Sequence, residues 1–228
     1  MGIYTGPNIS ASSSLIRYLD AGNPKSYGGT GSTWTDLCGN ANATKAGSQS
    51  PTQPAYNSGG WFNFTGGVNG NNYSRFDLSI PSLSNMTAIT WHRPTVAGGH
   101  VFRMSSDSFQ IGADNYAAGI RYNDVQVGHS VYGAPTGASR LNKWNCDAVT
   151  WDGQTVRSYA FGVPGGSTTR SSATTLAAGT LRIGARSDIY AAHYVGDIAI
   201  VAIFSSRLSD AEIFSYYHST RSRFGLSS

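Results

Sequence analysis

Gly196-Asp-Ile-Ala-Ile-Val-Ala-Ile-Phe204, followed by Ser205-Ser-Arg-Leu-Ser-Asp-Ala-Glu-Ile-Phe214, is the stretch of sequence that decides the fold. The run from Ile198 to Phe204 is entirely apolar, so it has no polar face to present to water. A short apolar run of this kind is typical of a strand that is covered on both sides. The sequence therefore predicts a strand here that is buried on both of its faces.

The residues that follow this strand predict a helix over 209–224. Ser209 and Glu212 match the Ser-x-x-Glu capping box, in which each side chain bonds the backbone of the other residue. Gly225 is a suitable stop, because glycine readily adopts the left-handed conformation found after helix ends. The expected buried face of the helix follows its 3.6-residue period and consists of Ile213, Tyr217, Thr220 and Phe224.

Several earlier segments resemble the sequence pattern of one family. Trp34-Thr-Asp-Leu-Cys-Gly-Asn40 is similar to W-x-D-L-S-G-N, and Trp144-Asn-Cys-Asp-Ala-Val-Thr-Trp-Asp-Gly153 is similar to W-x-H-V-A-V-T-Y-D-G. The other matching segments are residues 18–27, 63–64 with 76–80, and 88–94. Together with the strand, cap and helix at the end, these segments resemble the laminin-G-like, concanavalin A-like lectin/glucanase jelly-roll family, of the kind found in phage structural proteins.

The resemblance implies an all-β fold, an antiparallel jelly-roll β-sandwich with a short C-terminal helix. It implies a fold rather than a function, because such folds carry many activities. We expect an N-terminal arm over 1–14 and a single domain over 15–228. The expected strands are Met86–Trp91, Phe109–Ile111, Gly119–Tyr122, Asp147–Trp151, Thr155–Phe161, Leu181–Ile183 and Asp197–Phe204. Asp152-Gly153 is a strong hairpin signal, and Asn123-Asp124 is a weaker one.

The composition fits a surface that is polar but sparsely charged. Charged residues make up 12% of the chain, which is about half the usual share. The net charge of +4 is spread without a lysine or arginine run, so nucleic-acid binding is not indicated. No apolar run approaches the roughly 18 residues of a membrane span. Ser, Thr, Asn, Gly and Tyr must dominate the surface, as suits a particle exterior or a sugar-binding protein.

The first residues do not form a signal peptide, because they contain neither a positive segment nor an apolar core. A domain of extracellular type that is made without export is expected of a phage structural protein, translated in the host cytoplasm and exposed at the virion surface. Synthesis in the cytoplasm favours free thiols for Cys38 and Cys146 rather than a disulfide.

The sequence offers little for catalysis. Glu212 in the capping box is the one glutamate, and no two aspartates are spaced to lie together on one strand as a hydrolytic pair. Gly128-His-Ser-Val-Tyr-Gly133 misses the G-x-S-x-G pattern and is expected to be a glycine-bounded loop. The histidines are dispersed, which excludes the usual zinc spacings. We therefore expect no enzyme and no catalytic residue.

Two ligand sites remain to be considered. A structural calcium ion would need several oxygen ligands, and Asp20 and Asp197 would meet if the first and last strands pair. Asp20 and Asp36 are equally well explained as residues that form Asx-turns, so the metal ligands stay undetermined and no other cofactor is expected. Sugar binding would use exposed aromatic rings, and the loop tyrosines that fit are Tyr73, Tyr116, Tyr122, Tyr132, Tyr190 and Tyr194.

Four tryptophans are instead expected in the core or at its rim, because large aromatic residues at family strand positions usually point inward: Trp61, Trp91, Trp144 and Trp151. The favoured function is a non-enzymatic virion structural protein, a capsid decoration, cement or appendage subunit. Its arm would bind capsid or tail proteins, and the subunits would form a symmetric homo-oligomer such as a trimer. The alternative is a glycan-binding lectin module of a phage tail fibre or of a secreted protein, which would bind host surface glycans.

Overall fold

A computed structural model describes eleven stretches of the chain. They are residues 13–46, 53–65, 74–96, 99–104, 110–114, 117–122, 129–132, 140–169, 173, 175–185 and 193–226. For residues 110, 112–114, 117–122 and 129–132 the backbone alone is described. Most of the expected N-terminal arm, residues 1–12, lies outside the described residues.

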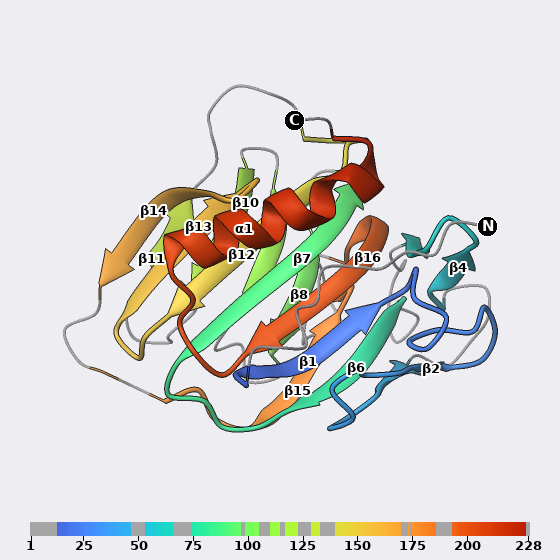
Figure 1. Cartoon of the computed structure of the whole chain (residues 1–228), viewed down its shortest axis with the longest axis horizontal. Coiled ribbons are helices and arrows are strands. Elements are labelled where there is room, and N and C mark those ends of the chain that lie inside the picture. The colour runs from blue at the N-terminus through green and yellow to red at the C-terminus, as the bar shows by residue number, and fades with distance from the viewer. Residues whose placement is uncertain are drawn as a thin grey trace.

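The described strands form two antiparallel sheets. Sheet A contains, in spatial order, β14 (Val163–Thr169), β13 (Thr155–Ala160), β12 (Asn145–Trp151), β7 (Met86–Pro94), β16 (Val195–Phe204), β5 (Trp61–Thr65) and β4 (Ala55–Asn57), and β1 (Leu15–Asp20) also pairs with β16. Sheet B contains β11 (His129–Tyr132), β10 (Ala117–Tyr122), β9 (Gln110–Asp114), β8 (His100–Met104), β15 (Gly179–Ile183), β6 (Arg75–Ile80), β3 (Ala43–Ala46) and β2 (Thr33–Trp34). The helix α1 (Asp210–Thr220) lies on the outer face of sheet A (Figure 1). This architecture confirms the predicted β-sandwich.

Strand β16 is buried on both faces, as its apolar run predicts. Val201 and Ile203 point into the core between the sheets, whereas Ala202 and Phe204 belong to a second core beneath the helix. Three strands pair with β16: β7 runs along one edge, and β5 and β1 follow each other along the opposite edge. The last strand of the chain is therefore a central strand of the sandwich.

The expected strands fall in β7, β9, β10, β12, β13, β15 and β16, with ends that differ by a few residues. Phe109 and the weaker hairpin at Asn123-Asp124 lie outside the described residues. The Asp152-Gly153 hairpin is confirmed: Gly153 has φ 90°, and Oδ1 of Asp152 accepts hydrogen bonds from the backbone amides of Gln154 and Thr155. The expected loop at 128–133 is wrong, because His129–Tyr132 pairs with β10 as strand β11.

The C-terminal helix begins as predicted and ends earlier. Ser209 accepts a hydrogen bond from the Glu212 backbone, and the carboxylate of Glu212 accepts one from the Ser209 backbone, so the capping box is confirmed. The α-helix ends at Thr220 and the chain continues as the 3₁₀-helix η2 (Arg221–Phe224). Gly225 follows with φ 71°, which is the expected left-handed stop.

The buried face of the helix differs from the expected one at a single position. Ile213, Thr220 and Phe224 are buried as predicted, but Tyr216 is buried where Tyr217 was expected. The half-buried Tyr217 stacks on Trp91 at 5.9 Å between ring centroids, while Phe224 stacks on the same indole at 4.1 Å. The 3₁₀ turn of η2 places Phe224 over Trp91. The indole of Trp91 therefore packs against both α1, through Tyr217, and η2, through Phe224.

Both cysteines are free, which confirms the expectation of no disulfide; Cys146 is buried and Cys38 half-buried. Burial raises the pKa of the Cys38 thiol to about 11, with a further increase from Asp36. Burial likewise holds the pKa of the Cys146 thiol well above its ordinary value. None of the helices that the structure describes is long and apolar enough to cross a membrane.

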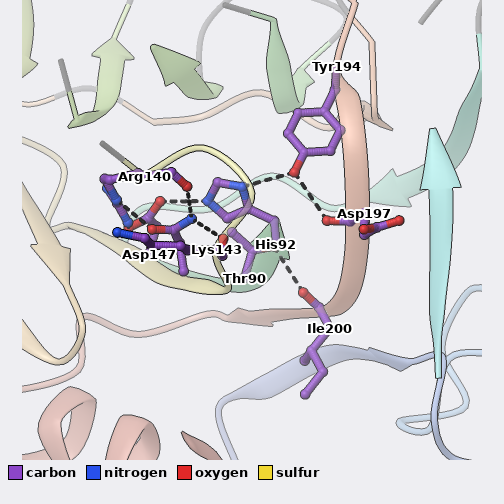
Figure 2. Close-up of polar contacts among 9 residues, drawn as sticks. Thr90, His92, Arg140, Lys143, Asp147, Tyr194, Asp197 and Ile200 are labelled. Atoms are coloured by element: carbon purple, nitrogen blue, oxygen red, sulfur yellow. Dashed lines mark hydrogen bonds and ion pairs between the residues drawn. The ribbon is translucent and has the colours of Figure 1, made fainter. Parts of the chain in front are cut away.

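A chain of polar side chains lies within the core between the sheets (Figure 2). His92 of β7 donates a hydrogen bond from Nε2 to Oδ2 of Asp147 (2.7 Å), and its Nδ1 lies 3.2 Å from the hydroxyl of Tyr194. Tyr194 in turn donates to the backbone carbonyl of Asp197 (3.1 Å). Arg140 forms an ion pair with the other oxygen of Asp147. Burial would raise the pKa of Asp147, but the charge of Arg140 and the hydrogen bonds outweigh it, so that pKa is lowered.

We expect Ser209→Ala to lower the free energy of unfolding by about 1 kcal/mol, because the first turn of α1 loses its side-chain cap. Urea denaturation measures the loss. The control is Ser215→Ala, which removes an exposed hydroxyl from the middle of the same helix and should cost nothing measurable. An unchanged stability of Ser209→Ala would show that the cap contributes nothing.

We expect Asp147→Asn to destabilise the domain by about 3–5 kcal/mol, because it leaves the Arg140 cation beside the core without its carboxylate. The folded pKa of Asp147 is lowered, so its contribution is complete above the unfolded pKa and is lost as the pH falls through the folded pKa. Stability measured between about pH 7 and pH 3 should therefore fall less steeply in the variant than in the wild type. Arg207→Gln, which breaks the exposed pair with Asp152, should cost about 0–1 kcal/mol, and an equal cost for both variants would contradict the argument.

Candidate functional site

The tyrosines expected to bind sugars do not form a described site. Tyr73, Tyr116 and Tyr190 lie outside the described residues, and for Tyr122 and Tyr132 the backbone alone is described. The interpretation of Tyr194 as an exposed loop residue is wrong. Its side chain is fully buried, because the chain is already paired here with the Gly184 backbone before it enters β16. Burial raises the pKa of its hydroxyl well above the ordinary value.

The tryptophans divide into two pairs. Trp91 and Trp151 are buried, as expected for core residues. Trp61 and Trp144 are half-buried on the outer face of sheet A, beside the second core, which places them at its rim. Their rings pack edge to face with 5.5 Å between centroids. These two half-exposed indole rings offer an aromatic surface to a ligand.

Arg93 lies against both of these rings. Its guanidinium carbon is 5.3 Å from the centroid of Trp61 and 5.1 Å from that of Trp144, within the range of cation–π contacts. Nε and Nη2 of Arg93 both donate to Oδ2 of Asp197, at 2.8 and 2.6 Å. Nδ2 of Asn63 donates to the other oxygen of Asp197 (3.0 Å). We call these five residues the Trp–Arg cluster.

The register of three adjacent strands builds the Trp–Arg cluster. Asp197 on β16 lies directly opposite Arg93 on β7 and directly opposite Asn63 on β5. Trp61 is two residues before Asn63 and therefore lies on the same face of the sheet. Trp144 precedes β12 and packs against Phe224 at 4.8 Å between centroids. The cluster thus lies beside η2.

The charges of Arg93 and Asp197 neutralise each other, but the Arg93 side chain remains accessible to solvent. The Asp197 side chain is 5% exposed, whereas 33% of the Arg93 side chain is exposed. Asp197 uses Nε and Nη2 of the guanidinium, so Nη1 is a further donor on the exposed side chain. The arrangement can therefore hold an apolar ring face against the indoles and donate hydrogen bonds to hydroxyl or carboxylate oxygens.

The two aspartates proposed for calcium do not converge. β1 and β16 pair as expected, but Asp20 lies opposite Ile200 and bonds Arg223 (2.6 Å), while Asp197 bonds Arg93. The alternative interpretation is confirmed, since Asp20 accepts from the Gly22 backbone and Asp36 from the Cys38 backbone, both two residues on. Among the residues described, no group of three or more His, Cys, Asp or Glu side chains is placed to hold a metal ion.

Sequence reasoning missed the Trp–Arg cluster. Its polar members come from three strands that are distant in sequence, and no spacing motif links Asn63, Arg93 and Asp197. Two positions in the sequence could have indicated the Arg93–Asp197 pair. Asp197 lies just before an apolar run and Arg93 lies near the end of another predicted strand, and charged residues that are buried at such positions usually need a partner.

Comparisons with known proteins agree with this architecture. The family model of the concanavalin A-like lectin/glucanases superfamily matches residues 68–214, which is more than half of the chain. No curated protein sequence matches the chain. Solved structures are similar in fold: a Trypanosoma rangeli sialidase in complex with 2,3-difluorosialic acid has 16% identity and a TM-score of 0.61 over 97% of this chain and 36% of that chain.

Two further structures show the same likeness. Botulinum neurotoxin type C, in a structure concerned with its interaction with two ganglioside molecules, has 15% identity and a TM-score of 0.64 over 90% of this chain and 51% of that chain. A heptameric SAP-like pentraxin from Limulus polyphemus has 15% identity and a TM-score of 0.52 over 78% of this chain and 81% of that chain.

At these identities the likeness shows the fold alone. The chain spans about a third of the length of the sialidase and about half of that of the toxin. The match of the family model, the two antiparallel sheets and the C-terminal helix together establish the family: the chain belongs to the concanavalin A-like lectin/glucanases superfamily and has its laminin-G-like jelly-roll fold.

Proposed function

We propose that this domain is a non-enzymatic carbohydrate-binding module whose binding site is the Trp–Arg cluster. The observation that carries the proposal is the position of Arg93, which is one-third exposed, lies against two half-exposed indole rings and is held by Asp197. Sugar rings have apolar C–H faces and polar edges, so they bind where an aromatic surface adjoins fixed hydrogen-bond donors. Trp61 and Trp144 supply the surface, and Arg93 with Asn63 supplies the polar groups.

Rigid support strengthens the case for binding at this place. Arg223 donates to the carbonyl of Gly60 (2.9 Å) and pairs with Asp20, which ties the turn before Trp61 to the C-terminal segment. The ring of Trp61 also lies against Gly59, where an added Cβ would come within 2.2 Å of it. A preformed aromatic surface loses little conformational freedom when a ligand binds. Two of the structures of the same fold concern sialic acid and ganglioside ligands, which is consistent with a glycan partner here.

The state of the carboxylates supports a binding role without catalysis. Most glycoside hydrolases cleave the glycosidic bond with a pair of carboxyl groups that flank it. Glu212 is committed to the helix cap, and Asp147 is buried. Each of the other aspartates whose side chain the structure describes bonds an arginine or backbone amides: Asp20, Asp36, Asp77, Asp152, Asp197 and Asp210.

We further propose that the module is displayed on a virus particle, as a capsid decoration, cement or appendage subunit made in the host cytoplasm. Its 12% share of charged residues and its two free cysteines support this setting. Residues 1–14 would bind capsid or tail proteins, in a symmetric homo-oligomer. Ser14 accepts a hydrogen bond from the Ser205 backbone (2.7 Å), so the arm joins the domain at the end of β16.

The second candidate is the same module in a phage tail fibre or in a secreted protein that mediates attachment to a host. The Trp–Arg cluster favours it equally, because a glycan-binding surface serves attachment as well as decoration. The two settings differ in copy number and in partners, and neither involves nucleic acid or a membrane span.

We expect the domain to bind glycans on an array of neutral and acidic sugars and Trp61→Ala to weaken the strongest binding at least tenfold, because the variant removes half of the aromatic surface. Isothermal titration calorimetry measures the affinity, and the bound glycan should be recovered uncleaved. The control is Tyr56→Ala, a half-buried aromatic residue on the adjacent strand β4 that packs against the core between the sheets. Binding that is absent from the wild type, or unchanged in Trp61→Ala, would contradict the proposal.

We expect deletion of residues 2–12 to leave the domain folded but to abolish its incorporation into particles, because the deleted residues precede the described domain. Thermal unfolding checks the fold, and quantitative mass spectrometry of purified virions measures incorporation. Copy numbers of the wild-type chain on the scale of the capsid indicate decoration, whereas numbers on the scale of fibres indicate an appendage. Equal incorporation of the truncated chain would rule out the arm as the attachment segment.

A further inference from the structure

Two large apolar side chains are exposed close together beside helix α1. Phe214 on the helix is 48% exposed, and Val163 at the start of β14 is 49% exposed. Gly162, next to Val163, allows the close approach, since an added Cβ there would lie 3.1 Å from the Cα of Phe214. The other large hydrophobic side chain exposed among the described residues is Val96, which follows β7. Exposed apolar residues that gather in one place mark interaction surfaces.

The charges of α1 are ordered around Phe214. The helix runs from Asp210 to Thr220, so Phe214 lies near its middle. Asp210 is one turn before Phe214 and His218 is one turn after it, on the same stripe of the helix. The rings of Phe214 and His218 are 4.0 Å apart between centroids. The outer face is therefore acidic at its beginning, aromatic in its middle and basic at its end, where Arg221 follows.

When two such helices lie antiparallel, the acidic end of each one faces the basic end of the other. Two copies related by a two-fold axis through the middle of the helix would lie antiparallel, with each Phe214 beside its counterpart. Asp210 of each copy would then lie near His218 of the other. We propose that the outer face of α1, together with the start of β14, binds a second copy of this chain and forms a two-fold dimer.

The acidic end is held in place for such a contact. Oδ1 of Asp210 accepts from the hydroxyl of Tyr159 (2.8 Å), and Arg157 pairs with the same carboxylate (3.1 Å). The Asp210 side chain is nevertheless 50% exposed, and an ionised carboxylate has about four acceptor sites. The carboxylate can therefore also accept a hydrogen bond from a second copy without losing its own partners.

The helix alone is too small for a stable dimer interface, so the proposed interface also includes the start of β14. A helix of 11 residues is about 16 Å long, and a stable interface buries about 800 Å² on each partner, more than one short helix provides. Val163, Pro164 and Gly165 are all exposed beside the helix and extend the surface. This inference does not depend on the carbohydrate site, which lies at the other end of the helical segment, beside η2.

The first test is the association state of the full chain. Sedimentation velocity over a series of concentrations should show a reversible dimer, and Phe214→Glu should weaken it at least tenfold by placing two carboxylates at the axis. The matched control is Val96→Glu, which puts the same charge at an equally exposed apolar position and should leave the dimer intact. A wild-type chain that stays monomeric at high concentration, or an oligomer unaffected by Phe214→Glu, would overturn the proposal.

The second test measures proximity directly and also detects a weak dimer, because the disulfide traps chains that associate only briefly. Phe214→Cys should form a disulfide-linked dimer rapidly under mild oxidation, because the two positions lie near the axis. Val96→Cys should not. The native thiols interfere little, since their raised pKa values keep both protonated near neutral pH. Circular dichroism shows that each variant is folded, and equal cross-linking of both variants would refute the two-fold contact.

Discussion

Burial of β16 on both faces is the constraint on which the rest of the structure depends. One set of its side chains fills the core between the sheets and the other fills the core beneath α1. A strand with this pattern is stable only when both layers are present, because either face alone would expose several aliphatic side chains to water. The helix is therefore an integral layer of the fold. Thr220 at its end accepts a hydrogen bond from the Trp91 indole, and Phe224 of the following η2 stacks on the same ring.

The sequence predicted the parts of the fold that depend on local pattern. The apolar run Ile198–Phe204 has no polar face, so it predicts a strand that is covered on both sides. The capping box, the Asp152-Gly153 hairpin and the stop at Gly225 each follow from the conformations that these residues prefer. Strands such as β14 were missed because Val163–Thr169 is rich in Gly, Ser and Thr and carries no hydrophobic alternation. The position of Tyr216 rather than Tyr217 in the core depends on how the helix is rotated against the sheet, which a periodicity does not determine.

The candidate site was beyond reach for a different reason. Asn63, Asp197 and Arg93 become neighbours through the order of strands in sheet A and through their register, and both are properties of the assembled sheet. The loop tyrosines were chosen by composition, and Tyr194 shows the weakness of that criterion. Its ring is in the core, and its hydroxyl donates a hydrogen bond to the backbone carbonyl of Asp197. Tyr194 thus bonds the backbone of Asp197 from the core side of sheet A, while Arg93 bonds the Asp197 carboxylate on the outer face.

The place of β16 in the chain has a consequence for synthesis. Its partners β1, β5 and β7 are all translated earlier, and β1 is separated from it by almost the whole length of the domain. Until residues 195–204 leave the ribosome, the edges of these strands that pair with β16 are open, and the contacts that close the sandwich are long-range. A nascent chain in this state exposes strand edges for much of its translation, which is the condition under which holding chaperones bind and premature pairing between chains occurs. Completion of the domain is therefore a late event set by the arrival of its final segment.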